Sequence, residues 1–282
     1  MKGIDHIVTK EHSGFFAWPT VFLGCAVGIG FFGSIVLTYL GFIALALCSC
    51  LNFILCYLAF TPLHEAVHNN IRGPFRQWQW IESAVGHITG TMLLGPYPCF
   101  VFLHLSHHAH TNEANHDPDM WVAGKSAWSV FWRCMSILPH YYHYFFTSQK
   151  RAARRVFWPT LLSLLTLFSL LAIAISLSSF SFILLAWILP AWFANAALAF
   201  MLDYLPHVPH NTIVRYKNTN IIYGSLIYWI SMGHSYHLIH HLWPRIPFYR
   251  YKRAFLANRS MLEKEGTPIF SSFTQLFEAW RH

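Results

Sequence analysis

Residues 64–68 read HEAVH, which places two histidines four positions apart with a glutamate directly after the first. Residues four apart lie on one face of a helix, so the imidazoles of His64 and His68 can reach one metal ion. The H-E-x-x-H pattern occurs in zinc metalloproteases, where the glutamate is the general base. The pattern therefore leaves two alternatives: a peptidase, or part of a larger metal site with other chemistry.

Two further histidine groups, HLSHH and the HLIHH of YHLIHH, share the spacing H-x-x-H-H. Because positions i, i+3 and i+4 fall on one helical face, we expect each triplet to present three imidazoles to one point. Asp203 and His207 form a D-x-x-x-H pair, which also has helical i, i+4 spacing. The nine candidate metal ligands are His64, His68, His104, His107, His108, His207, His237, His240 and His241.

These nine imidazoles exceed the four ligands of a single zinc ion. They suit two metal ions of higher coordination, and imidazole binds iron, copper, nickel and zinc alike. A peptidase would use HEAVH and leave six clustered histidines unused. Glu65 lies about 100° around the helix from His64, so we interpret it as a polar neighbour or a group that hydrogen-bonds near the site. Further candidates next to the clusters are His110, His210 and His234.

The apolar segments that carry these histidines are long enough to cross a membrane. Of the 282 residues, 55% are hydrophobic and 11% are charged, whereas soluble domains have about 25% charged residues. No Lys, Arg, Asp or Glu occurs between Glu11 and Glu65, or between Arg155 and Asp203. Each gap exceeds twice the ~20 residues of one spanning helix and therefore predicts a helical hairpin. We expect spans at roughly 17–38, 41–63, 157–178 and 181–202.

The predicted fold is an all-α integral membrane protein with four transmembrane helices, arranged as two hairpins with a cytosolic histidine-rich cap. An apolar stretch around residues 81–103 is interrupted by glycines and prolines, and we expect it to be re-entrant or interfacial. No internal repeat or linker divides the chain, so residues 1–282 are interpreted as a single domain.

The basic residues indicate the orientation of this multi-pass protein. They lie before, between and after the two hairpins, whereas the turns within the hairpins carry no charge. The positive-inside rule then places both termini and the histidine clusters on the cytoplasmic side. The net charge of +8 follows from this topology. It favours anionic lipid headgroups and acidic protein partners, and nucleic acid is not expected as a partner.

The histidine motifs resemble those of the membrane fatty acid desaturase/hydroxylase superfamily. The finer resemblance is to carotenoid hydroxylases of the cyanobacterial β-carotene hydroxylase type. It is carried by HEAVHN at 64–69, HLSHHAHTNEANHDPD at 104–119, DYLPHVP at 203–209 and YHLIHHLWPRIPFYRY at 236–251. The first motif has three residues between its histidines, where many acyl desaturases have four, which favours the carotenoid side of the superfamily.

This resemblance implies a non-haem diiron centre, held by the nine histidines, that uses O2 as co-substrate. It implies that Asp203 lies near one iron, often through water. We expect Asp117 and Asp119 either to hydrogen-bond to ligating histidines or to form a turn. The implied activity is that of a membrane-bound diiron monooxygenase that hydroxylates a carotenoid, at carbon 3 of the β-carotene ring. The alternative is a fatty-acyl desaturase or hydroxylase on the same scaffold, and a remote alternative is an intramembrane H-E-x-x-H zinc protease.

No catalytic side chain beyond the metal centre is expected, because metal and O2 carry such chemistry and the protein positions the substrate. No flavin or nicotinamide fingerprint occurs in the sequence. We therefore expect a separate, ferredoxin-like electron donor, which docks on the basic cytosolic face. The apolar lipid substrate is expected to enter laterally from the bilayer. A metal transporter would place ionisable residues inside its spans, and both hairpins lack them.

Overall fold

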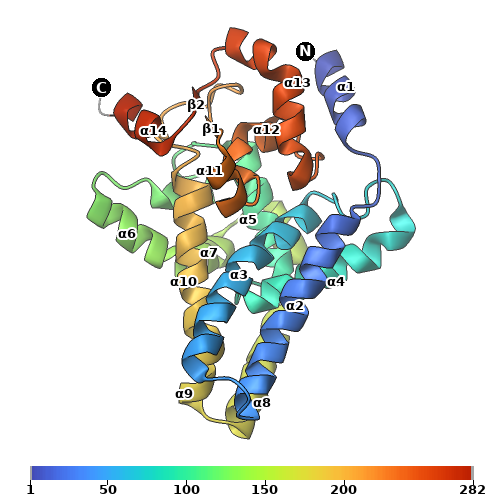
Figure 1. Ribbon diagram of the computed structural model, residues 1–282, viewed down its shortest axis with the longest axis vertical. Helices are drawn as coiled ribbons and strands as arrows, with labels where there is room; N and C mark the ends of the chain where they lie inside the picture. The colour runs from blue at the N-terminus through green and yellow to red at the C-terminus, as the bar shows by residue number, and fades with distance from the viewer. Residues whose placement is uncertain (1, 281–282) are drawn as a thin grey trace.

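The computed structural model describes residues 2–280 of the chain, with side chains for residues 7–279. Figure 1 shows long helices in the lower half and a cap of short helices above them, with both described ends at the cap. The only strands in the described part are β1 (Ile221–Ile222) and β2 (Ile269–Phe270), which pair in parallel with Ile221 opposite Ile269. The expected all-α class is confirmed.

Four helices are long and apolar enough to cross a membrane. They are α2 (Trp18–Tyr39), α3 (Leu45–Val67), α8 (Arg151–Leu177) and the composite helix Phe180–Tyr204. They coincide with the four predicted spans, with the ends displaced by a few residues. The turn between α2 and α3 and the turn between α8 and α9 lie at the end of the bundle opposite the cap (Figure 1). The two predicted hairpins are therefore present.

The fourth span is not a regular α-helix. It consists of α9 (Phe180–Ile183), the π-helix η3 (Leu184–Ile188), α10 (Leu189–Leu198) and the π-helix η4 (Ala199–Tyr204). Wide π turns are rare and occur frequently at functional sites. Regular helical geometry ends before His207, so Asp203 and His207 are not joined by a regular turn of α-helix.

Helices α4 (Gln79–Met92) and α5 (Tyr97–His110) form a pair bent by 94°. This pair is the interrupted apolar segment expected around residues 81–103. Backbone carbonyls at membrane depth are costly when unsatisfied. Three side chains donate to the carbonyls at this bend: Trp187 to Met92 at 3.2 Å, Asn195 to Leu93 at 2.9 Å, and Tyr142 to Leu94. These hydrogen bonds allow a non-helical turn to lie among the spans.

The cap has its own apolar core, formed mainly by the last third of the chain. Leu238, Trp243, Tyr251 and Phe255 are buried in it. Burial of these side chains fixes α12, which carries the third histidine motif. The remaining elements are α1 (Lys2–His12), η1 (Arg76–Trp78), η2 (Pro118–Val122), α6 (Ala127–Met135), α7 (Ile137–Thr147), α11 (Ser225–Ile230), η5 (His234–Tyr236), α12 (His237–Leu242), η6 (Phe248–Arg250), α13 (Tyr251–Lys264) and α14 (Phe273–Trp280).

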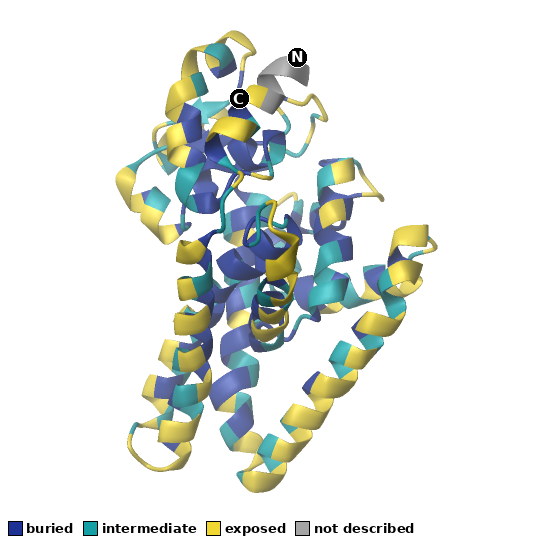
Figure 2. Ribbon diagram, turned by 90° about the vertical axis from the view of Figure 1, so that its right-hand side faces the viewer, coloured by how far each residue is buried: buried dark blue, intermediate teal, exposed yellow. Residues whose placement is uncertain are grey.

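Helix α8 is the span with the least protein contact. Only 11% of its most apolar stretch of 18 residues is buried. In Figure 2 it diverges from the other long helices and is mostly exposed. Its exposed apolar side chains include Trp158, Leu162 and Leu165. Such a surface is unfavourable in water and matches the hydrocarbon of a bilayer.

Candidate metal centre

The nine predicted histidines lie together at the ends of α3, α5 and α12, with His207 contributed by the segment after η4. Their ring nitrogens form two clusters, and in each cluster one nitrogen per histidine lies within 4.8 Å of the others. The first cluster contains His64, His68, His104 and His240, and the second contains His107, His207, His237 and His241. The Nε2 atom of His108 lies 3.1 Å from that of His104 and 2.7 Å from that of His240, so His108 is a fifth member of the first cluster.

Each H-x-x-H-H motif divides between the two clusters. His104 and His108 are separated by about 40° around the helix, whereas His107 is rotated by about 60° in the opposite direction. The i, i+4 pair therefore enters one cluster and the i+3 histidine enters the other. The third motif divides in the same way, with His237 and His241 in the second cluster and His240 in the first. The expectation that each triplet aims at one point is wrong.

The spacing of the nitrogens fits metal ions at the centres of the clusters. The Nε2 atoms lie 3.0 Å apart in His64 and His240, 2.9 Å apart in His68 and His104, and 3.1 Å apart in His107 and His241. Two ligands at right angles on an ion with bonds of ~2.1 Å are about 3 Å apart. A neutral imidazole has one donor and one acceptor nitrogen, so hydrogen bonds alone do not satisfy so many converging nitrogens.

Buried nitrogens without partners lead to the same conclusion. Both ring nitrogens of His207 and the Nδ1 atoms of His64 and His237 are buried and have no hydrogen-bond partner. Burying such polar atoms unpaired costs free energy. A bond from one ring nitrogen to a metal ion would remove this cost for that nitrogen of His207. The all-imidazole donor set therefore fits the diiron centre implied by the sequence.

Three groups outside the clusters orient the imidazole rings. The Nδ1 atoms of His240 and His241 lie 3.0 Å from the Tyr251 hydroxyl and 3.3 Å from the Thr111 hydroxyl, respectively. Contacts at Nδ1 leave Nε2 directed into the cluster. Sequence reasoning missed both hydroxyls. Thr111 has a signal, because it lies four residues after His107 on the helix face of a ligand, whereas the spacing of Tyr251 from the motif gives none.

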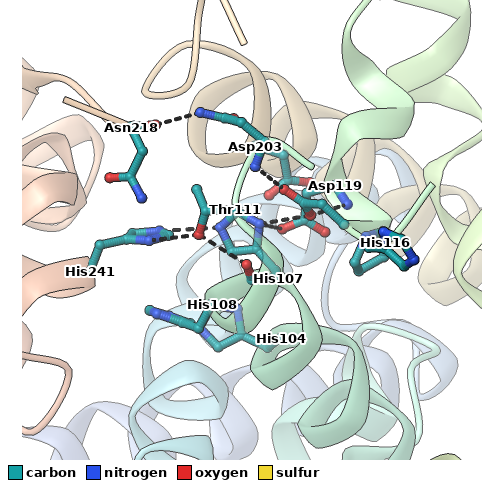
Figure 3. A network of polar contacts seen from close by, with 12 residues as sticks. His104, His107, His108, Thr111, His116, Asp119, Asp203, Asn218 and His241 are labelled. Atoms are coloured by element: carbon teal, nitrogen blue, oxygen red, sulfur yellow. Dashed lines mark hydrogen bonds and ion pairs between the residues drawn. The ribbon is translucent and has the colours of Figure 1, made fainter. Parts of the chain in front are cut away.

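The third orienting group is a buried carboxylate network beside His107. The His107 Nδ1 atom lies 2.9 Å from Asp117 and 3.2 Å from Asp119. The Tyr141 hydroxyl lies 2.7 Å from Asp119 and 3.0 Å from Asp203. In Figure 3, Asp119 and Asp203 lie on the side of His107 away from His104 and His108. Asp203 thus approaches the centre through Tyr141, which sequence reasoning also missed.

Asp117 serves both of the roles considered for it. Its carboxylate contacts His107 and also accepts a hydrogen bond of 2.9 Å from the backbone N–H of Asp119, at the start of η2. Burial raises the pKa of Asp119 to about 6, although the neighbouring His107 acts in the opposite direction. The same segment is therefore a turn and a support for a candidate ligand.

Glu65 belongs to neither cluster. It accepts a hydrogen bond of 3.2 Å from Asn70, whose side chain also donates to the Pro244 carbonyl at 3.0 Å. These contacts join the end of α3 to the loop after α12. A metalloprotease needs its glutamate beside the metal-bound water, so this position of Glu65 does not fit a protease.

The three further histidine candidates differ in their surroundings. His234 is buried, with its ring 4.9 Å from that of His64 and its Nε2 atom 3.3 Å from the Thr61 hydroxyl. Burial lowers the pKa of His234 to about 3. The half-exposed His110 pairs with Glu113 at 2.9 Å, and the ring of His210 lies 6.2 Å from that of His207. Of the three, His234 is the closest neighbour of a cluster.

A largely apolar cavity reaches both clusters, and we call it the catalytic cavity. Its empty volume, including its mouth, is about 910 Å³. Apolar side chains of α3, α5, α7 and the fourth span line it, among them Phe100, Leu138 and Leu198. The histidines that line its polar end are His64, His104, His107, His234 and His237. The arrangement places an apolar lining beside the candidate metal centre.

Known proteins of similar sequence support this interpretation. A family model described as fatty acid desaturase matches residues 37–273, which include all nine histidines. Fatty acid conjugase FAC2 B of Calendula officinalis is 26% identical over 257 residues, covering 74% of this chain and 67% of that protein. A Delta(9) fatty acid conjugase-like enzyme of Dimorphotheca sinuata is 26% identical over 262 residues, covering 74% of this chain and 68% of that protein.

Proposed function

The chain belongs to the fatty acid desaturase family, and on this premise we propose that it oxidises the hydrocarbon chain of a fatty-acyl lipid with O2. It is a membrane oxidoreductase of the desaturase/hydroxylase type. The observation that carries the proposal is the pair of histidine clusters at the polar end of an apolar cavity. The relatives named as fatty acid conjugases favour an acyl chain over a carotenoid as the substrate.

We propose that the two clusters each hold one iron ion. The first iron would be held by His64, His68, His104, His108 and His240, and the second by His107, His207, His237 and His241. Bound iron supplies the activation of O2 and the one-electron chemistry that side chains lack. Asp117, Thr111 and Tyr251 keep the Nε2 atoms of their histidine partners directed inward.

The residues of the catalytic cavity position the substrate and exclude water. Leu138, Leu198 and Leu202 align an acyl chain whose reacting carbon lies beside His64 and His104. Tyr141 also lines this cavity, and its hydroxyl donates towards the carboxylates of Asp119 and Asp203 beside His107. The depth to which the chain enters decides which carbon is oxidised, and its placement decides between a hydroxyl group and a double bond.

Ring 3-hydroxylation of β-carotene is the second candidate. The HLIHHLWP-x-IP motif and the Asp-Pro-Asp after the second histidine group favour it. The curated relatives give it no support, because their names refer to fatty acids.

We also propose that the capped end faces the cytoplasm and receives electrons from a separate acidic, ferredoxin-like protein. The basis is the distribution of basic residues and the lack of a flavin or nicotinamide fingerprint. The basic residues on this face are Arg151, Arg154, Arg155, Arg245, Arg250, Lys252 and Arg253, of which all but the half-buried Arg250 are exposed.

Expression in a β-carotene-producing host, followed by pigment, fatty acid and metal analysis, tests the proposal. We expect new unsaturated or hydroxylated fatty acids, unchanged carotenoids and two irons per chain. Hydroxylated carotenoids with unchanged fatty acids would establish the second candidate instead. One zinc per chain without any oxidised lipid would contradict both.

A further inference from the structure

A second apolar hollow opens on the side of the bundle, and we call it the lateral groove. Its walls come from α7, α8, η3 and the bend before α5, and include Phe146, Leu164, Phe168 and Leu171. Its empty volume, including its opening, is about 920 Å³. Phe168 is 62% exposed and Phe146 is 46% exposed, so the groove is open to the surroundings of the bundle.

The position of the lateral groove identifies what surrounds it. Leu164 and Leu171 lie in the central part of α8 and are separated by about 10 Å of helix. Charged residues do not occur in α8 after Arg155. The helix diverges from its neighbours in Figure 2. A hollow at the middle of a span is filled by hydrocarbon, because water and headgroups are absent at that depth.

Two side chains of α7 separate the lateral groove from the catalytic cavity. Leu138 and Tyr142 line both hollows. They are four residues apart and therefore lie on one face of α7. The Tyr142 hydroxyl donates to the Leu94 carbonyl, which holds its ring in the partition. The partition is thus one layer of side chains, and rotation of these two residues would connect the groove to the cavity.

We propose that the lateral groove is the substrate entrance and that the substrate is an acyl chain of an intact bilayer glycerolipid. This inference rests on the proposed acyl oxidation. The chain enters between α7 and α8, passes Leu138 and Tyr142, and reaches the cavity beside His64. A soluble acyl thioester reaches this opening only after its chain has moved from water into the bilayer, whereas the chains of a glycerolipid already lie at this depth. A lipid headgroup stays at the membrane surface while its chain enters.

Photocrosslinking in lipid nanodiscs tests the entrance. The probe is phosphatidylcholine with a diazirine in the middle of one acyl chain, and labelled peptides are identified by mass spectrometry. We expect labels on the α7 segment that contains Leu138 and Tyr142. Leu164→Trp places a bulky ring in the groove and should reduce this α7 labelling several-fold. The matched control is Leu165→Trp, because Leu165 is an exposed neighbour on α8 outside the groove, and it should leave the labelling unchanged.

Labelling requires no turnover, so the entrance and the proposed oxidation can fail separately. Equal α7 labelling in Leu164→Trp and Leu165→Trp, or labels confined to the outer face of α8, would overturn the entrance. A soluble substrate and a different route would be assigned by two results together. Leu164→Trp would oxidise an acyl-CoA at the wild-type rate, and the wild-type protein would carry no label on α7. Specific labelling of α7 without any oxidised lipid would support the proposed entrance and contradict the proposed oxidation of lipids.

Discussion

His207 is the single residue that tests the second cluster most directly, because neither of its buried nitrogens has a partner in the protein. We expect His207→Ala to lose one of the two irons. Removing an outer hydrogen-bond partner of a ligand already costs roughly 10–100-fold in metal affinity or activity, so activity should fall by more than about 100-fold. Iron analysis and turnover of the purified protein measure both effects.

The choice of control for this variant matters. His143 is an exposed histidine on α7, and His143→Ala should keep full iron content. His140 is a poorer control, because its ring stacks on Trp121 at 4.4 Å and its Nε2 atom lies 3.1 Å from the Pro118 carbonyl, between the two aspartates. Full iron content and activity in His207→Ala would remove this residue from the ligand set.

A substitution of Asp117 tests whether this residue supports metal binding in addition to forming a turn. Asp117→Asn removes the negative charge beside His107, and its one amide oxygen can still accept from the Asp119 N–H. Its amide nitrogen replaces the oxygen that accepts from the Asn112 N–H at 2.8 Å. We expect iron affinity to fall about 10-fold, the lower end of the range for such partners. Glu113→Gln is the matched control, because Glu113 pairs with the half-exposed His110 outside the clusters. Unchanged affinity in chelator competition would leave Asp117 with the turn alone.

Lowering the pH of the metal-free protein tests whether its buried histidines are neutral. Burial lowers the pKa of His68 and of His234 to about 3, below the value of about 6.5 in an unfolded chain. Between these values the unfolded chain binds protons that the folded protein does not, so stability is full above pH ~6.5 and is lost as the pH falls towards 3. Each histidine contributes up to ~1.4 kcal/mol per pH unit. The Tm in detergent should fall from pH 7.5 to 5, and a constant Tm would contradict neutral burial.

At the scale of elements, the spans could be predicted from the sequence and their irregularities could not. A charge-free stretch is a property of composition, so the hairpins around α2, α3, α8 and α10 were accessible to prediction. The π turns of the fourth span and the bend after Met92 depend on contacts between distant residues, such as Asn195 with Leu93. Such contacts cannot be predicted from the composition of the segments.

In the candidate site too, features set by neighbouring residues could be predicted, and features set by contacts between distant elements could not. The division of each H-x-x-H-H motif follows from helix geometry alone, since His107 is rotated away from His104 and His108. The position of Tyr141 between Asp119 and Asp203 requires α7 to pack against η2 and η4. The contact of Tyr251 with His240 likewise requires α13 to fold back on α12.

The bend between α4 and α5 provides an element-scale prediction. Asn195→Leu keeps the size of the side chain but leaves the Leu93 carbonyl without its donor at membrane depth. An unsatisfied buried acceptor costs about 1–3 kcal/mol, which corresponds to a fall in Tm of several degrees. In the control Asn258→Leu, the lost donor serves the Ala254 carbonyl at a half-exposed position of α13. Equal Tm values for the two variants in detergent would show that the bend does not need this hydrogen bond.

At the scale of the whole molecule, the ligands come from parts of the chain that are far apart. His64 and His68 belong to the first hairpin, His207 follows the second, and His240 lies in the cap. Neither cluster is complete within one hairpin, so metal binding and assembly of the bundle are coupled. The same assembly leaves basic residues such as Arg245 and Arg253 exposed at the capped end.

Electron delivery provides the whole-molecule prediction. Arg245 is exposed and close enough to His68 to lower the pKa of that imidazole, although burial is the larger cause. If an acidic ferredoxin docks there, Arg245→Glu together with Arg253→Glu should raise the KM for the donor and leave the iron content unchanged. The double reversal Arg154→Glu with Arg155→Glu shows whether the start of α8 belongs to the same docking face.

Turnover should also fall as salt rises, because the Debye length shrinks from ~30 Å at 0.01 M to ~8 Å at 0.15 M. Turnover that responds neither to salt nor to either pair of reversals would place the donor on another surface, and the iron assignment would stand, because it rests on the histidines alone.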